Sequence, residues 1–238
     1  MPKIRIDDDL VRAKRGLRWL RLEEALHGTD CPICFQIERT ETHYLEGMLY
    51  EYVLDVGVRK KLHGEYGLCT RHAVLAVQME RKLNSDGLHL ATMFETVIEE
   101  SIRKLNNQVE IMKRLTEGNR KKRLVHSVYV SRCLVCHFVE ETEQIISNGF
   151  LYFSSDEELI NAYNSSTSIL CFRHIEMLVK ERVNVHIIRI TLQKLEKMKV
   201  ALSNFIKKHD YQSAHDYNED ELQSYLAVVR FFSGKYRA

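Results

Sequence analysis

The six cysteines of this 238-residue chain follow one repeated pattern. A Cys-x2-Cys pair, Cys31 and Cys34, is followed after a spacer of 34 residues by a Cys-x2-His pair, Cys69 and His72. The same four residue types recur 102 positions later with no gap, at Cys133, Cys136, Cys171 and His174. A repeat of this length indicates a duplicated small domain, since solenoid units have periods of about 20–50 residues. We therefore expect two similar lobes related by pseudo-symmetry.

The composition predicts an all-α fold for both lobes. Two prolines and ten glycines leave few helix breakers, and 45% hydrophobic residues suffice to bury a core. The expected organisation is an N-terminal helical extension (1–28), repeat 1 (29–115), a basic connector (116–128), repeat 2 (129–209) and a C-terminal helix or tail (210–238).

The ligand pairs are expected at the first turns of helices. Asp30, Cys31 and Pro32 form a helix-start signature, and the helix that follows should run to about Leu54. A second helix should open near Leu68, which places Cys69 and His72 on one face of its first turn. A third, long helix from about 87 to 115 has an apolar stripe expected to be core, formed by Leu90, Phe94, Val97, Leu105 and Met112.

Three thiolates and one imidazole are a standard tetrahedral ligand set for structural zinc. We expect each repeat to form its own site, so that Cys31, Cys34, Cys69 and His72 hold one ion and Cys133, Cys136, Cys171 and His174 hold the other. Such a centre has a net negative charge, which helix N-terminal amides and the neighbouring Arg71 or Arg173 could offset. The prediction is two zinc ions per chain.

Other interpretations of the same residues stay open. An iron–sulfur cluster with one histidine in place of a thiolate uses the same ligands. A dithiol redox centre is expected in a βαβ context and would leave the Cys-x2-His pairs unexplained. The string "CLVCH" at 133–137 matches a haem-attachment signature, but its counterpart "CPICF" lacks the histidine. The basic run "RKKR" at 120–123 would suit a nucleic-acid-binding regulator.

Charge and motif content narrow the function classes. Thirty-five basic residues against thirty-three acidic ones give no overall field that would attract nucleic acid or an anionic membrane. No uncharged apolar run reaches the ~18 residues of a membrane-spanning helix, so we expect a cytoplasmic protein whose cysteines are reduced. Four protein ligands per metal leave no open position for a substrate, and no catalytic residue is assigned. The preferred function is an interaction or scaffold module with an unknown protein partner, and an iron–sulfur protein with a redox or sensing role is the alternative.

The segments "CPICFQIERTETHYLEGMLYEYVLDVGVRKKL", "GLCTRHA" and "SYLAVVRFFSG" resemble an uncharacterised prokaryotic family of unknown function with paired Cys-x2-Cys and Leu-Cys-x-Arg-His elements. The resemblance covers most of the chain and implies a helical, metal-binding protein without a known activity. Repeat 2 departs from the fuller pattern, because Leu134 replaces Pro32 and "ELINAYNS" replaces "DVGVRKKL".

Overall fold

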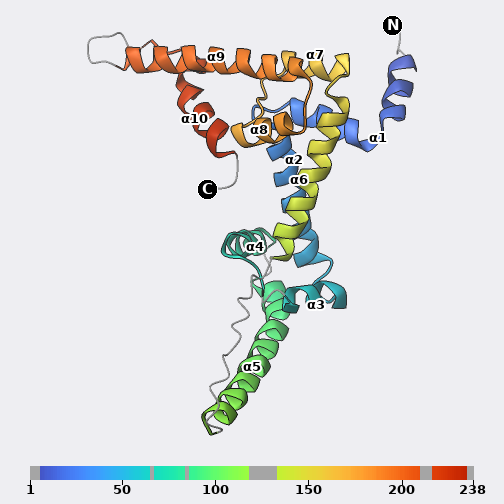
Figure 1. Cartoon of the computed structure of the whole chain (residues 1–238), viewed down its shortest axis with the longest axis vertical. Coiled ribbons are helices and arrows are strands. Elements are labelled where there is room, and N and C mark those ends of the chain that lie inside the picture. The colour runs from blue at the N-terminus through green and yellow to red at the C-terminus, as the bar shows by residue number, and fades with distance from the viewer. Residues whose placement is uncertain (1–5, 65–66, 84–85, 118–132, 210–215, 235–238) are drawn as a thin grey trace. The chain divides into compact units, whose positions relative to one another are not determined.

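The computed structural model describes residues 6–64, 67–83, 86–117, 133–209 and 216–234, and all regular elements in these ranges are α-helices (Figure 1). This confirms the predicted all-α class. None of the described helices is both long enough and apolar enough to cross a bilayer. The helices are α1 (Ile6–Leu26), α2 (Pro32–Tyr50), α3 (Val56–Gly64), α4 (Thr70–Lys82), α5 (Leu88–Glu117), α6 (Leu134–Phe153), α7 (Glu157–Ser165), α8 (Phe172–Lys180), α9 (Val185–Lys208) and α10 (Glu219–Ser233).

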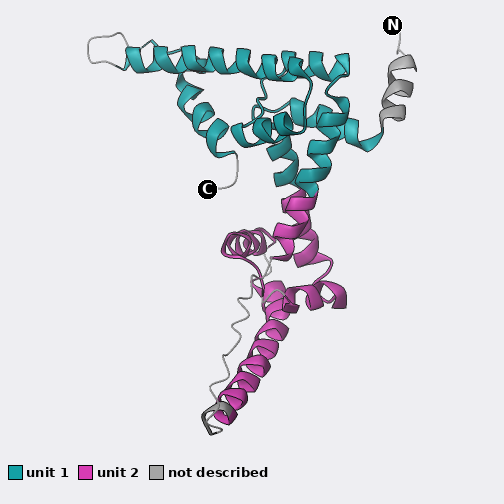
Figure 2. Cartoon of the chain, viewed as in Figure 1, with its two compact units in different colours: residues 1–39, 142–238 teal, residues 40–141 magenta. Residues whose placement is uncertain are grey.

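The chain divides into two compact units, coloured separately in Figure 2. Unit 1 consists of residues 1–39 and 142–238, and unit 2 of residues 40–141. The boundaries fall inside α2 and α6, so each unit contains residues from both sequence repeats. The pseudo-symmetry of the two lobes stays a prediction, as do the repeat boundaries. The basic run at 120–123 lies outside the described residues.

Unit 1 contains a continuous hydrophobic core in which α1, α2, α6, α7, α8 and α9 all take part. α1 contributes Trp19, whose ring meets Phe153 edge to face at a centroid distance of 5.2 Å. An edge-to-face pair of this kind adds roughly 1 kcal/mol to the burial of its surfaces. The largest fully buried members of the core are Trp19, Leu22, Ile33, Phe150, Leu159, Tyr163 and Leu170.

The segment that leads into α8 is fixed by Tyr163 and Lys194. The backbone N–H of Leu170 donates to the Tyr163 hydroxyl at 3.1 Å, and that hydroxyl also lies 2.9 Å from Thr191 Oγ1. The Lys194 ammonium donates to the backbone carbonyls of Ser166 at 2.9 Å and Ser168 at 2.7 Å. Because buried backbone groups need such partners, these contacts determine where residue 171, the next position along the chain, is placed.

α2 and α6 meet in both units, and different halves of the two helices meet in each unit. In unit 1 the first turn of α2 shares the core with later turns of α6, since Ile33 belongs to the same cluster as Ile146 and Phe150. In unit 2 the later part of α2 meets the start of α6, where Tyr44 stacks on Phe138 at a centroid distance of 4.3 Å. The beginning of each helix therefore lies beside the later turns of the other.

The expected core stripe of the third long helix is wrong in its second half. In α5 Val97 is buried, whereas Leu105 is 61% exposed and Met112 is 52% exposed. α5 packs against α3 and α4, but all the side chains described from 105 to 114 are exposed. An apolar stripe at helical spacing shows that a face is apolar, but it does not show that anything covers it.

Candidate metal centres

The eight predicted ligands gather in two groups of three cysteines and one histidine, but their pairing differs from the expectation. The Cys-x2-Cys pair of each repeat joins the Cys-x2-His pair of the other repeat. The predicted within-repeat sets are therefore wrong, although the residues themselves do come together. The Cys31 group, in unit 1, consists of Cys31, Cys34, Cys171 and His174, and the Cys69 group, in unit 2, consists of Cys69, His72, Cys133 and Cys136.

The arrangement of α2 and α6 explains this exchange. Cys31 and Cys34 stand at the beginning of α2, and in unit 1 this end shares a core with the later turns of α6. The chain leaves α6 on that side and reaches Cys171 through α7, so the second Cys-x2-His pair arrives at the first Cys-x2-Cys pair. The same relation in unit 2 brings Cys69 to the beginning of α6. Sequence spacing alone cannot distinguish these two pairings.

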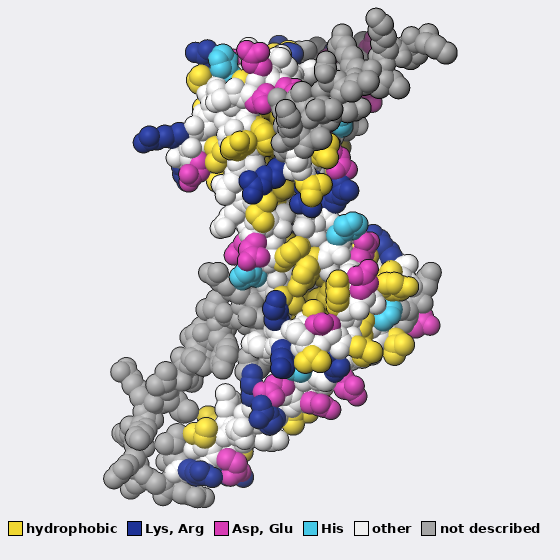
Figure 3. All heavy atoms as spheres, turned by 90° about the vertical axis from the view of Figure 1, so that its right-hand side faces the viewer, with side chains coloured by type: hydrophobic (Ala, Val, Ile, Leu, Met, Phe, Trp, Pro, Cys, Tyr) yellow, Lys and Arg dark blue, Asp and Glu magenta, His cyan; other side chains and the backbone are white. Residues whose placement is uncertain are grey.

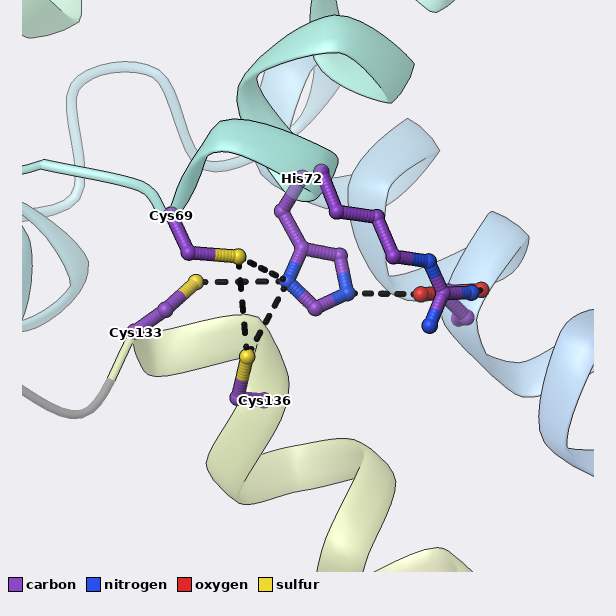
Figure 4. Close-up of polar contacts among 6 residues, drawn as sticks. Cys69, His72, Cys133 and Cys136 are labelled. Atoms are coloured by element: carbon purple, nitrogen blue, oxygen red, sulfur yellow. Dashed lines mark hydrogen bonds and ion pairs between the residues drawn. The ribbon is translucent and has the colours of Figure 1, made fainter. Parts of the chain in front are cut away.

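In the Cys69 group three sulfurs surround one imidazole nitrogen (Figure 4). His72 Nδ1 lies 3.1 Å from Cys69 Sγ, 3.4 Å from Cys133 Sγ and 3.3 Å from Cys136 Sγ. The sulfurs of Cys69 and Cys136 are 3.7 Å apart. Two of the ligands come from the start of α4 and two from the start of α6, so the group joins two helix N-termini.

The Cys31 group has the same geometry. His174 Nδ1 lies 3.3 Å from Cys31 Sγ, 3.4 Å from Cys34 Sγ and 3.1 Å from Cys171 Sγ. The Cys34 and Cys171 sulfurs are 3.8 Å apart. The group joins the start of α2 to the start of α8, and both of its histidine nitrogens are engaged with nearby groups.

Cys69 and Cys171 are the N-cap residues of α4 and α8. Their backbones are extended, with φ/ψ of −65°/163° for Cys69 and −67°/162° for Cys171, which confirms the expected placement at helix starts. A helix N-terminus offers free N–H groups and the positive end of the helix dipole. Both stabilise negative charge nearby, so the backbone favours a cation-bound sulfur at these positions.

Behind each histidine lies a buried glutamate that the sequence analysis missed. His72 Nε2 donates to Glu41 Oε1 at 2.6 Å, and His174 Nε2 donates to Glu143 Oε1 at 2.9 Å. A carboxylate in this position keeps the proton on Nε2, which leaves the Nδ1 lone pair directed at the sulfurs. The signal was available, because Glu41 and Glu143 are separated by the same 102 positions as the ligands.

The two arginines proposed to offset charge act through these glutamates. Arg71 Nη2 donates to Glu41 Oε2 at 2.8 Å, and Arg173 Nη2 donates to Glu143 Oε2 at 2.8 Å. Each glutamate is buried, with its side chain 4% exposed for Glu41 and 8% for Glu143. Each arginine thus neutralises a buried carboxylate and fixes its orientation, and the carboxylate in turn fixes the imidazole.

Without a metal, both groups favour a thiolate beside an imidazolium. Burial opposes charge at His72, but hydrogen bonds with Cys133 and Glu41 raise its pKa to about 10. Burial likewise raises the pKa of Cys133, but the hydrogen bond with His72 and hydrogen bonds with backbone groups together outweigh burial and lower this pKa to about 6. In the other group, hydrogen bonds from Cys31 and Cys34 lower the pKa of Cys171 to about 3. A cation that enters either group must therefore displace protons, so its affinity should rise with pH.

The end of α10 covers the Cys31 group. A Cβ atom at Gly234 would lie 3.7 Å from Cys34 Sγ and 3.9 Å from Cys171 Sγ. Gly234 has φ of +66°, a conformation that glycine adopts without strain, so the chain turns directly over the sulfurs. Arg230, one turn earlier, forms an ion pair with Asp30 at 3.5 Å, next to Cys31.

We expect Glu41→Gln to weaken metal binding in the Cys69 group about 10- to 100-fold, the usual cost of losing a carboxylate that orients a ligand histidine. An amide has no negative charge to balance Arg71 and His72, and its NH₂ group would oppose the Arg71 guanidinium. Competition with a chromophoric chelator measures the affinity. Glu143→Gln is the matched variant and should affect only the Cys31 group, whereas equal losses at both sites from either variant would contradict the assignment.

Fold and sites together define an all-helical protein with two Cys3His groups suited to metal binding. The model of DUF6062, a family of unknown function, matches residues 14–236. The chain therefore belongs to this family, in agreement with the resemblance found in its sequence. No curated protein and no solved structure matches the chain.

Proposed function

We propose that each Cys3His group binds one structural zinc ion, and that the protein is a helical interaction or scaffold module. Each ion would stabilise the unit in which it lies. The observation on which the proposal rests is the spacing of the ligand atoms. In a tetrahedral site with Zn–S bonds of about 2.3 Å and Zn–N bonds of about 2.0–2.1 Å, two sulfurs lie about 3.8 Å apart and a sulfur and a nitrogen about 3.5 Å apart.

The separations in the structure are close to these values. Cys69 Sγ and Cys136 Sγ are 3.7 Å apart, Cys34 Sγ and Cys171 Sγ are 3.8 Å apart, and the sulfur–nitrogen distances lie between 3.1 and 3.4 Å. All the ligand atoms of a group lie within 4.8 Å of one another. These separations favour a single ion over a cluster. A multi-iron cluster needs a wider cage, because each thiolate binds a different iron and inorganic sulfides lie between the irons.

A structural role follows from the closed ligand set. Four protein ligands complete the tetrahedral coordination of a zinc ion, and the second nitrogen of each histidine is hydrogen-bonded to a glutamate. The ion would stabilise the fold by joining two helix starts that lie far apart in the sequence. In this proposal the Cys31 group ties α2 to α8, and the Cys69 group ties α4 to α6. The use of reduced cysteines as ligands fits the proposed cytoplasmic location.

The scaffold proposal rests on the apolar surface that the helices present. α10 has one face of exposed side chains, formed by Leu222, Tyr225, Leu226, Val229 and Phe232. Exposed apolar residues at helical spacing on one element are typical of protein-binding surfaces. The nucleic-acid alternative has no support among the described residues, since its basic run lies outside them.

Elemental analysis with a visible spectrum tests this proposal. Protein purified without air should contain two zinc ions per chain, no acid-labile sulfide and no absorbance in the visible range. Iron with stoichiometric sulfide and a broad band near ~400 nm would replace the proposal with a redox or sensing function. Iron without sulfide would agree with a single ion in each group but would contradict the choice of zinc.

A further inference from the structure

From Ile98 onward, α5 presents a seam of apolar side chains that are about half exposed or more. Its side chains are Ile98 (61% exposed), Ile102 (54%), Leu105 (61%), Val109 (47%) and Met112 (52%). In Figure 1 this part of α5 continues well beyond α3 and α4, the helices that pack on its first half. Figure 3 shows hydrophobic side chains open to the surface among charged ones.

A helix of this kind needs a partner to be stable. Helices of fewer than ~12–15 residues are marginal in water, and most of the stability of a protein helix comes from packing of its apolar face. Every side chain described from 105 to 114 is exposed, so packing on described residues buries little of this half of α5. Two ion pairs within the helix, Arg103 with Glu100 at 2.7 Å and Lys113 with Glu110 at 2.9 Å, lie at the surface, where such pairs contribute little to stability.

The spacing of the seam identifies the kind of partner. The five residues are separated by four, three, four and three positions, which is the alternation of a and d positions in a coiled coil. Ile102 and Val109 occupy a positions, and Ile98, Leu105 and Met112 occupy d positions. A face that only rested on a globular partner would be wider and would follow a 3.6-residue period.

The flanking charges identify the partner as a second copy in antiparallel orientation. The e positions are Glu99, Asn106 and Lys113, and the g positions are Ser101 and Gln108. A parallel pair would bring g beside e and would contain no pair of opposite charges. An antiparallel pair brings e beside e, so that Glu99 of each copy meets Lys113 of the other.

One register satisfies both the seam and the charges. If Leu105 of one copy packs against Val109 of the other, then Ile102 packs against Met112, and the a and d layers alternate as an antiparallel coiled coil requires. In the same register Glu99 lies beside Lys113, and Asn106 faces its own counterpart at the centre. The hydrophobic pattern and the charge pattern are independent of each other. That both fit the same register supports this arrangement.

We propose that the chain forms a homodimer through an antiparallel coiled coil of α5, centred near Asn106. The seam is short, and the area it would bury is on the order of 1,000 Å² over both copies, close to the lower limit for specific interfaces. The dimer should therefore be weak, with a dissociation constant in the micromolar range.

Sedimentation velocity on the full-length, metal-loaded chain from about 1 to 200 μM tests the proposal, because this range brackets a micromolar dissociation constant. The wild type should change from monomer to dimer over this range. Val109→Glu should weaken association at least about tenfold, since it places a charge inside the apolar seam. The matched control is Ile111→Glu, on the same helix, 52% exposed and outside the seam, which should leave association unchanged.

A charge exchange tests the orientation. Glu99→Lys should weaken the dimer several-fold, because it places lysine beside Lys113 of the other copy. The double variant Glu99→Lys with Lys113→Glu should recover it. Unchanged zinc content and helicity verify that the variants are folded.

Several outcomes would overturn the proposal. A wild type that stays monomeric to the highest concentration would show that the seam does not join two copies. A dimer that survives Val109→Glu would place the interface elsewhere, for example on α10. Equal losses from Val109→Glu and Ile111→Glu would show that the seam has no special role.

Discussion

Replacing Cys69 and Cys133 together by serine should leave one metal ion per chain, whereas replacing Cys31 and Cys69 together should leave none. The first pair belongs to one ligand group and the second pair to two groups. Ligand sets formed within each repeat would give the reverse result, with no ion left in the first variant and one in the second. The two double variants therefore decide between the exchanged pairing and the pairing suggested by the sequence.

Mass spectrometry under native conditions, after a chelator wash, counts the ions. Each variant changes two cysteines to serine, so the number of substitutions is the same. The single variant Cys69→Ser is the control, because it should retain one ion under either pairing. If both double variants kept one ion, neither arrangement of the ligands would stand.

Metal removal should unfold unit 2 while unit 1 keeps part of its helical structure. Structural zinc contributes about 10–16 kcal/mol of apparent binding free energy in small zinc-binding peptides, comparable with the whole stability of about 5–15 kcal/mol of an ordinary domain. Unit 1 has the continuous core around Trp19 and Phe150 to support it. Unit 2 relies more on its Cys69 group, since half of its longest helix, α5, is exposed.

Hydrogen exchange followed by mass spectrometry, on loaded protein and on protein stripped by acid and chelator, measures this difference. Amides of α4 and of the first half of α5 should lose their protection, and those of α6 beyond residue 142 and of α9 should keep more of theirs. Readdition of zinc should restore the protection of α4, which separates loss of metal from irreversible damage. Equal protection in the loaded and stripped protein would show that the ions do not support the fold.

The all-α class and the eight residues that form the two Cys3His groups were predictable from the sequence. Few helix breakers and the helix-start signature at Asp30 and Pro32 predict helices, and α2 does begin at Pro32. The fixed offset of 102 residues marks these eight cysteines and histidines, because the same residue types recur at the same spacing. Glu41 and Glu143 share that offset and could have been found by the same comparison, since a ligand histidine usually needs a carboxylate behind it.

The pairing of the ligands and the exposure of α5 were decided only by the tertiary structure. Spacing shows which residues belong to a repeated pattern, but which Cys-x2-Cys pair meets which Cys-x2-His pair depends on how α2 and α6 pack. Likewise, the apolar positions of α5 are visible in the sequence, but whether Leu105 is covered depends on the elements around it. Local chemistry fixes helices and ligand types, because both depend on residues near one another in the chain, whereas pairing and burial depend on contacts between distant segments.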